Sequence, residues 1–340
     1  MTHEFKELIV QGIQWQEQDI PMVLATVVAL DGSSYRRPGV RMLMNAHGEW
    51  KGAVSGGCVE KEVYHQAQQV FKTGQARLMS YDGRFRLGCE GTIYIVLEPF
   101  SVGSAFAKAF TTLLKDRATF SCTTYYDRTT CNEKPTKKIG TLVHLGKETY
   151  GFDASFEEID KDQAHFFQEF PPLLQLYIFG AEHDAVALSN MASNVGWEVH
   201  IIAPPDEQKT SAYFSGASSL QTPTFETLDT SGIDNTTAVV LMTHSFHKDI
   251  QYLMALRDTQ PLYFGLLGPL HRRERVFSEF LERFPDTEPE FLEKIHGPAG
   301  INIGAENASE IAISIIAEIL TVLRKQQPMS LREKQGAIHE

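Results

Sequence analysis

The second half of the chain alternates between short apolar runs and helical segments, and this alternation constrains the fold more than any other feature of the sequence. The apolar runs are LLQLYIFG, EVHIIA, AVVLMTH and PLYFGLLG, and the helical segments lie near 184–195, 271–284 and 308–325. Strands that alternate with helices form a parallel sheet with helices on both faces. Asn307, followed three residues later by Glu310, is a capping-box-like start for the last helix. The pattern predicts a Rossmann-like, doubly wound parallel sheet over residues 173–327.

The first hundred residues have a different pattern, in which several short strands accompany two helices. Apolar residues at helical spacing predict helices at 5–17 and 59–71, the second ending before Gly74. The predicted strands are MVLATVVAL, VRMLMN, WKGAVS, ARLMSYD and GTIYIVLEPF, followed by a helix over 101–116. This arrangement indicates an N-terminal α+β domain over residues 1–116 with an antiparallel or mixed sheet.

Residues 117–172 are polar and rich in threonine, which favours a hairpin-bearing connector over a domain. Pro171 and Pro172 end this segment, and paired prolines lack backbone donors and stiffen the chain. We therefore expect the C-terminal domain to begin at 173, and we expect a tail over 328–340. The predicted fold class is α/β, with an N-terminal α+β domain followed by a Rossmann-like domain.

Composition argues against several classes of protein. Lys and Arg number 31 against 43 Asp and Glu, a net charge of −12 without a basic block, so a nucleic-acid partner is not expected. No apolar run reaches the roughly 18–20 residues that cross a bilayer, and the N-terminal segment lacks a signal-peptide pattern. We expect a cytoplasmic protein without a membrane partner. The four cysteines, at 58, 89, 122 and 131, form no CxxC pair, so neither a disulfide scaffold nor a zinc site is expected.

The turn YIFGAEHDA lies where a dinucleotide fingerprint would begin. Gly180 and Ala185 match the pattern Gly-x-Gly-x-x-Gly/Ala, but Glu182 occupies the position of the second glycine. Its carboxylate adds bulk and negative charge where a pyrophosphate would lie. The second strand ends at Ala203, without an acid for the ribose, and Asp206 and Glu207 can substitute only if the turn bends back. We predict that NAD and NADP bind weakly or not at all, and that the turn serves strand-to-helix packing.

The segment Ser55-Gly56-Gly57-Cys58 combines a flexible turn with a thiol at the start of a helix. Converging N–H groups and the helix dipole favour an anion, and a helix start stabilises a thiolate. A second Gly-Cys turn contains Cys89, and the two turns can converge on one ligand. The alternative is a tight turn with Cys58 packed as a small apolar residue. The two remaining cysteines are interpreted as structural.

Arg36, Arg37 and Arg41 form the only dense basic cluster in the N-terminal half. In a chain of net charge −12, such a cluster can bind a phosphate or a carboxylate. Solvated arginines that flank a Pro-Gly turn are an equally good interpretation.

The strand AVVLMTH ends at His244, at the sheet edge where folds of this kind bind ligands. We expect His183 to face the same crevice and Asp184 to cap the helix that begins there. His247 and Asp249 follow closely, but no metal-binding spacing is present, so we interpret these side chains as hydrogen-bonding loop residues.

Taken together and in order, several segments resemble the XdhC/CoxI family. They are GSSYRRPGVRML, VSGGCVE, LGCEG, IFGAEHDA, MTH, YFGLLGPLHRR and GPAGINIGAENASEIAISIIAEI, and they cover about 20–100 and 173–322. Members are accessory proteins that mature molybdenum hydroxylases such as xanthine dehydrogenase. The resemblance implies a cofactor chaperone, more than an enzyme, that binds the molybdenum cofactor (molybdopterin) transiently, assists its sulfuration and inserts it into the hydroxylase. The implied partners are that hydroxylase, a cysteine desulfurase and a second copy in a homodimer.

The resemblance also implies which residues contact the cofactor. They are the two Gly-Cys motifs, the arginine turn and the glycine turn, with His244 beside them: Arg36, Arg37, Arg41, Ser55, Gly56, Gly57, Cys58, Cys89, Gly180, His183, Asp184 and His244. The chain departs from the family at Glu182 and Glu90, where members have glycine, and at Ala203, where they have aspartate. Two other functions stay open: an NAD(P)-dependent oxidoreductase that uses the Rossmann crevice, and a dimeric scaffold that contacts the hydroxylase without handling cofactor.

Overall fold

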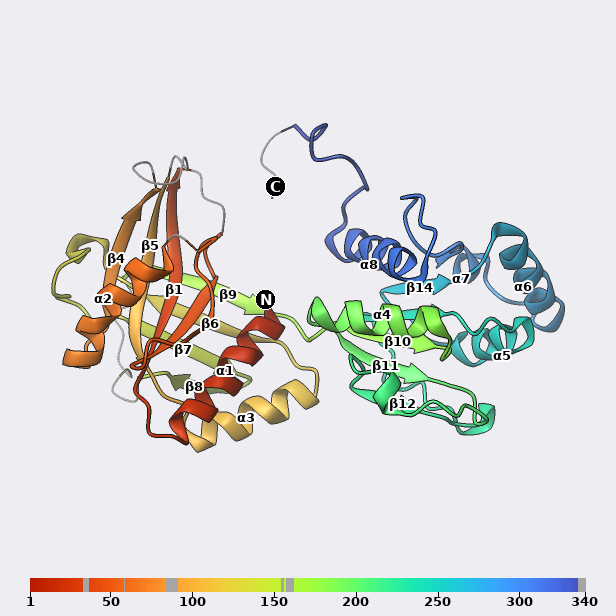
Figure 1. The fold of residues 1–340 in the computed structure, drawn as a ribbon, viewed down its shortest axis with the longest axis horizontal. Helices are drawn as coiled ribbons and strands as arrows, with labels where there is room; N and C mark the ends of the chain where they lie inside the picture. The colour runs from red at the N-terminus through yellow and green to blue at the C-terminus, as the bar shows by residue number, and fades with distance from the viewer. Residues whose placement is uncertain (33–36, 58, 84–90, 154–155, 157–161, 336–340) are drawn as a thin grey trace. The chain divides into compact units, whose positions relative to one another are not determined.

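The computed structural model describes the chain except for residues 33–36, 58, 84–90, 154–155, 157–161 and 336–340. The chain divides into two compact units, Met1–Pro172 and Leu173–Glu340 (Figure 1). The division falls directly after the paired prolines.

A five-stranded antiparallel sheet forms the first part of unit 1. Its strands are β1 (Met22–Gly32), β2 (Arg41–Asn45), β3 (Trp50–Gly52), β4 (Arg77–Asp82) and β5 (Gly91–Phe100), in the order β3-β2-β1-β5-β4. Helix α2 (Glu60–Thr73) buries Val63, Ala67 and Val70 against one face of this sheet. Gly74 ends the helix in the left-handed conformation, which glycine adopts at low cost.

The segment 117–172 differs from the predicted connector, because it forms a second antiparallel sheet within unit 1. Its strands are β6 (Phe120–Tyr125), β7 (Gly140–Leu145), β8 (Glu148–Gly151) and β9 (His165–Phe170), in the order β8-β7-β6-β9. Phe120 and Phe170 stack at 4.6 Å and share a core with Phe5 of helix α1 (Thr2–Gln16) and Phe110 of helix α3 (Ser104–Lys115). Threonine is polar but favours strands, so a threonine-rich stretch is compatible with a buried sheet.

Unit 2 contains a parallel sheet, as the alternating pattern predicts, and the sheet has six strands where the sequence indicated four. The strands are β10 (Gln175–Phe179), β11 (Glu198–Ile202), β12 (Ser219–Gln221), β13 (Thr237–Leu241), β14 (Tyr263–Leu266) and β15 (Ile295–His296). Their order, β12-β11-β10-β13-β14-β15, is the 3-2-1-4-5-6 order of dinucleotide-binding folds. The predicted fold class is therefore confirmed.

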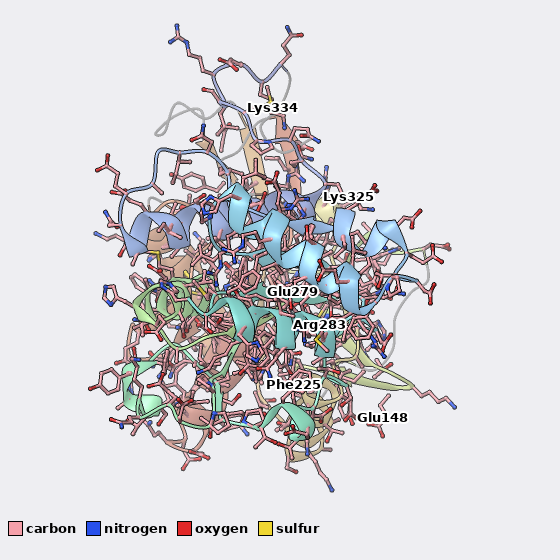
Figure 2. All side chains as sticks on the ribbon, turned by 90° about the vertical axis from the view of Figure 1, so that its right-hand side faces the viewer. Glu148, Phe225, Glu279, Arg283, Lys325 and Lys334 are labelled. Atoms are coloured by element: carbon pink, nitrogen blue, oxygen red, sulfur yellow. The ribbon has the colours of Figure 1, made fainter. Side chains whose placement is uncertain are left out.

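Helices cover both faces of the parallel sheet. Helices α4 (His183–Asn194) and α8 (Ala308–Arg324) pack on one face, and α5 (Phe246–Leu256), α6 (Leu270–Arg283) and α7 (Pro289–Glu293) pack on the other. Helix α6 buries Val276 and Phe280 and places the ion pair between Glu279 and Arg283 on its outer side (Figure 2). Asn307 caps α8 by accepting the N–H of Glu310 at 3.0 Å, which confirms the predicted start of this helix. Among the described residues, no helix is both long and apolar enough to span a bilayer.

Candidate functional site

The crevice of unit 2 lies where the strand order reverses, between the carboxyl ends of β10 and β13. Ligands of doubly wound sheets bind at this switch point. Gly180 follows β10 with a φ of +136°, and a Cβ atom there would lie 2.5 Å from the carbonyl oxygen of Met242. The glycine is therefore required for the close approach of two backbone segments, which supports the packing interpretation of the turn.

Glu182 begins helix α4 and lines an open cavity of about 490 Å³. Its carboxylate makes no capping hydrogen bond and is exposed. The other lining residues come from the turn after β11 and from two neighbouring segments: Pro204, Asp206, Glu207, Gln208, Lys209, Tyr213 and Lys248. The turn after β11 therefore does bend back toward Glu182.

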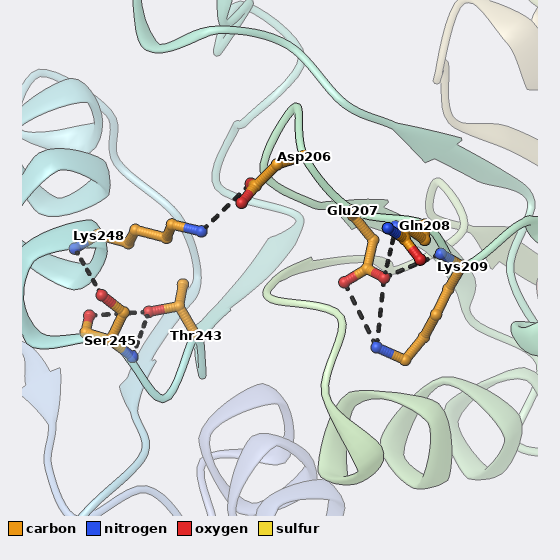
Figure 3. A network of polar contacts seen from close by, with 7 residues as sticks. All are labelled: Asp206, Glu207, Gln208, Lys209, Thr243, Ser245 and Lys248. Atoms are coloured by element: carbon orange, nitrogen blue, oxygen red, sulfur yellow. Dashed lines mark hydrogen bonds and ion pairs between the residues drawn. The ribbon is translucent and has the colours of Figure 1, made fainter.

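The charges in this cavity are mostly paired with one another (Figure 3). The ammonium of Lys248 lies 3.4 Å from Asp206, and that of Lys209 lies 3.3 Å from Glu207. The backbone N–H of Lys209 and then its side chain lower the pKa of Glu207, although partial burial acts to raise it. Glu182 adds a third carboxylate against two ammonium groups. A pyrophosphate would meet net negative charge here, where dinucleotide-binding folds offer bare N–H groups.

His244 and Asp184 form a pair across the switch point. Nε2 of His244 lies 2.9 Å from Oδ2 of Asp184, although 60 residues separate them in sequence. Asp184 does not cap α4 as predicted. Glu182 holds the N-cap position, and Asp184 is the second residue of the helix. When the imidazole is neutral and donates from Nε2, its Nδ1 is an acceptor for a ligand. The side chain of His244 is 53% exposed, so this acceptor is within reach of solvent.

Asp249 supports the turn that carries His244. Its carboxylate is 1% exposed and accepts the hydroxyl of Thr243 at 2.6 Å and Nη2 of Arg272 at 2.7 Å. Ser245 caps α5 from the same turn (Figure 3). These contacts hold His244 at a φ of +54°, a left-handed conformation that non-glycine residues seldom adopt. Asp249 is therefore a positioning residue, and sequence reasoning missed its partners because they lie in different elements.

The remaining histidines of the crevice are less constrained. His183 is the first residue of α4 and is exposed, and His247 is also exposed in the first turn of α5. In the part of the chain that the structure describes, no three His, Cys, Asp or Glu side chains gather in a way that would hold a metal ion.

The glycine turn of unit 1 brings N–H groups together, but onto a side chain of the protein. Glu60 is 3% exposed and accepts the N–H of Ser55 at 2.8 Å, its hydroxyl at 2.8 Å and the N–H of Val59 at 3.1 Å. Burial acts to raise the pKa of Glu60, but the hydrogen bonds from Ser55 and the backbone outweigh it and lower the pKa. Gly56 and Gly57 are exposed, and among the described residues beyond its chain neighbours a Cβ atom on either would meet no atom within 4 Å. Sequence reasoning missed Glu60, although an acid in the first turn of a helix is a recognisable signal.

The predicted arginine cluster does not form one surface patch. Arg37 is exposed, whereas Arg41 is 7% exposed and donates to the carbonyl of Gly39 and the amide oxygen of Gln168. The reason is that Arg41 begins β2, a strand whose residues are all buried, and lies against Phe5 of α1. Arg36 lies outside the described residues, as do Cys58 and Cys89.

The two other cysteines are described. Cys122 is fully buried in the core of unit 1, and burial raises the pKa of its thiol to about 12. Cys131 is half-buried, and both thiols are free. A thiol with a raised pKa is a poor nucleophile and a poor metal ligand, which agrees with a structural role for Cys122.

Comparison with known proteins extends over both units. The model of the XdhC Rossmann domain matches residues 176–319, and the model of the XdhC and CoxI family matches residues 15–82. A probable xanthine dehydrogenase subunit of Bacillus subtilis (strain 168) is 27% identical, over 89% of this chain and 93% of its own. The molybdenum cofactor insertion chaperone PaoD of Escherichia coli (strain K12) is 26% identical, over 90% of this chain and 84% of its own. A crystal structure described as a xanthine dehydrogenase from Bacillus halodurans superposes with a TM-score of 0.75 at 26% identity, covering 94% of this chain and 96% of that one.

Proposed function

Because this chain belongs to the XdhC and CoxI family, we propose that it is a maturation factor that carries the molybdenum cofactor to a xanthine dehydrogenase-type hydroxylase. One observation carries the proposal: the similarity to a molybdenum cofactor insertion chaperone spans 90% of this chain and 84% of that protein. A match of that extent includes residues of both units. We also propose that the protein protects the cofactor while a cysteine desulfurase sulfurates it. A further part of the proposal is that the protein acts as a homodimer.

The exposed turn of unit 1 is the proposed contact for the cofactor in that unit. Gly56 and Gly57 are exposed, and open space around their Cβ positions among the described residues supports this choice. The hydrogen bonds of Glu60 fix this turn before any ligand arrives. Cys58, next in sequence, would offer a soft sulfur to a dithiolene-bound metal. Cys89 and the exposed Arg37 complete the proposed set, and Arg36 is carried over with them.

Arg41 is left out of the surface contacts because its guanidinium is buried. In unit 2 the proposed contacts are those at the switch point: Gly180, His183, Asp184 and His244. The pairing of His244 with Asp184 supports this choice, since a carboxylate that holds the imidazole makes it an oriented hydrogen-bonding group. Weak or absent NAD(P) binding is part of the same proposal, and the negative charge around Glu182 supports it.

The test is retention of released molybdenum cofactor by the purified full-length protein. We expect wild type to retain cofactor through gel filtration, and Cys58→Ala and Cys89→Ala to retain less. Cys131→Ala is the matched control, because this cysteine lies in the same unit without a glycine turn. No retention by wild type would exclude the chaperone function, and equal retention by all variants would remove both cysteines from the site.

A second assay separates delivery from scaffolding. Loaded protein is mixed with a cofactor-free hydroxylase, and the recovery of hydroxylase activity is followed. The proposal requires activity to rise with loaded protein and not with empty protein. Co-purification with the hydroxylase without any cofactor transfer would favour the scaffold instead.

A further inference from the structure

The cavity beside Glu182 in unit 2 has one charged side chain without a partner. Its volume is about 490 Å³, within the range of roughly 300–1,000 Å³ that is usual for small-molecule sites. Two of its carboxylates are paired, Asp206 with Lys248 and Glu207 with Lys209 (Figure 3). Among the described residues, no hydrogen bond or ion pair engages the exposed carboxylate of Glu182. Glu182 is therefore free to accept hydrogen bonds from a ligand.

The charges around Glu182 argue against two classes of ligand. The cavity has three carboxylates against two ammonium groups, so an anion would meet net negative charge. A metal ion needs several ligands, and within the described part of the chain no three His, Cys, Asp or Glu side chains gather in a way that would hold one. A neutral ligand with N–H donors fits better, because it satisfies the carboxylate without adding negative charge.

A tyrosine in the same cavity favours a flat ligand. Tyr213 ends the short helix η3 (Ser211–Tyr213) in the segment after β11, and its side chain is 60% exposed. It lines the cavity together with Glu182, which comes from the turn after β10. Exposed aromatic side chains stack on the faces of heteroaromatic rings. The cavity thus offers an acceptor for the edge of a ring and an aromatic side chain for its face.

We infer that this cavity binds a 2-amino-4-oxopyrimidine ring, with the carboxylate of Glu182 accepting from the ring N–H and from the 2-amino group. These two donors are adjacent and parallel, so they match the two oxygens of one carboxylate, as the donors of a guanidinium do. Pterins and guanine share this ring edge. The inference rests on the proposed function for its natural ligand, which is the pterin of the molybdenum cofactor. The phosphate of that cofactor then lies outside the acidic cavity.

The test is a fluorescence titration of the full chain with 6,7-dimethylpterin and with 6,7-dimethyllumazine. The lumazine has a carbonyl oxygen where the pterin has its 2-amino group. We expect wild type to bind the pterin about tenfold more tightly, which corresponds to one charged hydrogen bond. Guanosine and inosine form a second pair that differs in the same amino group, and comparison of guanosine with the pterin identifies the source of the ring. Equal affinities within both pairs would overturn the inference.

Variants separate the edge contact from stacking. Glu182→Gln keeps the shape of the side chain but loses one acceptor oxygen, so it should bind the pterin about tenfold more weakly and lose the preference over the lumazine. Tyr213→Leu should weaken both compounds by a similar factor, because stacking does not depend on the amino group. Glu274→Gln is the control, because it removes the same charge from an exposed position of α6 outside the cavity lining. A preference that survives in Glu182→Gln would place the ring elsewhere and refute the contact.

Retention of released molybdenum cofactor separates this inference from the proposed function. If wild type and Glu182→Gln retain the cofactor equally through gel filtration, the chaperone function stands and the contact at Glu182 is refuted. If wild type prefers the pterin through Glu182 but retains no cofactor, the ring site stands and the proposed function is refuted. Weaker retention by Glu182→Gln than by wild type and Glu274→Gln would support both.

Discussion

Each unit has a glycine turn at the start of a helix, and the two turns differ in how closely they are packed and in where the nearest acid lies. In unit 1, Gly56 and Gly57 are open to solvent, and the neighbouring N–H groups converge on the buried carboxylate of Glu60. In unit 2, Gly180 is pressed against the backbone at Met242, and the carboxylate of Glu182 is exposed beside a cavity. A glycine turn before a helix is therefore not an anion site by itself. The placement of the nearest acid decides which ligand it can take.

The largest difference between the turns should appear when their glycines gain a methyl group. Gly180→Ala combines a φ of +136° with a Cβ contact of 2.5 Å to backbone, and we expect a loss of about 4 kcal/mol of unfolding free energy. Gly57→Ala has a φ of +113° but open space, so only the strain of about 1–2 kcal/mol applies. Urea unfolding measures both, and Gly56→Ala is the unstrained control. Equal losses at Gly57 and Gly180 would refute the assigned packing role of Gly180.

Two buried carboxylates hold turns, Glu60 at the glycine turn of unit 1 and Asp249 at the His244 turn of unit 2, and their contributions to stability should also differ. Asp249→Asn leaves the guanidinium of Arg272 without its counter-charge next to a 1% exposed position. Arg272 is itself 22% exposed, so we expect the free energy of unfolding to fall by about 2–3 kcal/mol. This is less than the full cost of breaking a buried pair. The measurement is again urea unfolding. Asp258→Asn, in an exposed pair with Arg257, is the control and should cost less than about 0.5 kcal/mol.

Glu60 should give a smaller and pH-dependent effect. Its partners are N–H groups and a hydroxyl without a full charge, so Glu60→Gln should cost about 1.5 kcal/mol at neutral pH. Because the pKa of Glu60 is lowered from 4.5 on folding, its contribution is present above about pH 4.5 and is lost as the pH falls through the folded value.

Unfolding of wild type and Glu60→Gln over pH 3–7 tests this dependence. The two curves should converge at the acid end and separate toward neutral pH. Glu62→Gln, in the same helical turn and hydrogen-bonded to the amide of Gln66, is the matched control. A gap that stays constant with pH would mean that the ionised form of Glu60 is not what holds the turn.

The sequence predicted the layout of unit 2 because long strands and helices have a clear period. It missed helices α5 and α7. It also missed β12 and β15, of three and two residues, since strands that short have no measurable alternation. It also missed the sheet of β6 to β9, where the polarity of threonine concealed its preference for strands.

The site was less accessible to sequence reasoning than the fold. Gly180 and His244 were found because they follow strands, and ligands gather at strand ends. The pairing of His244 with Asp184 joins two elements 60 residues apart, and no local pattern encodes such a contact. Arg41 is buried because helices cover both faces of β2, so that every residue of the strand is buried, and no local pattern around Arg41 shows that cover.

The smallest effect, and the most direct test of the comparison, is the removal of the acid at the second turn. Glu182→Gly restores the glycine of the dinucleotide pattern and removes one carboxylate from the cavity. Glycine is accepted at a helix N-cap, and Glu182 makes no capping bond, so stability should change little. We expect NAD affinity by calorimetry to rise by no more than about fivefold, because Asp206 and Glu207 still line the cavity. Glu207→Gln is the control for charge alone. A rise in NAD affinity far above fivefold in Glu182→Gly would mean that this one carboxylate blocks an otherwise intact dinucleotide site. The difference between the two turns would then depend on a single residue.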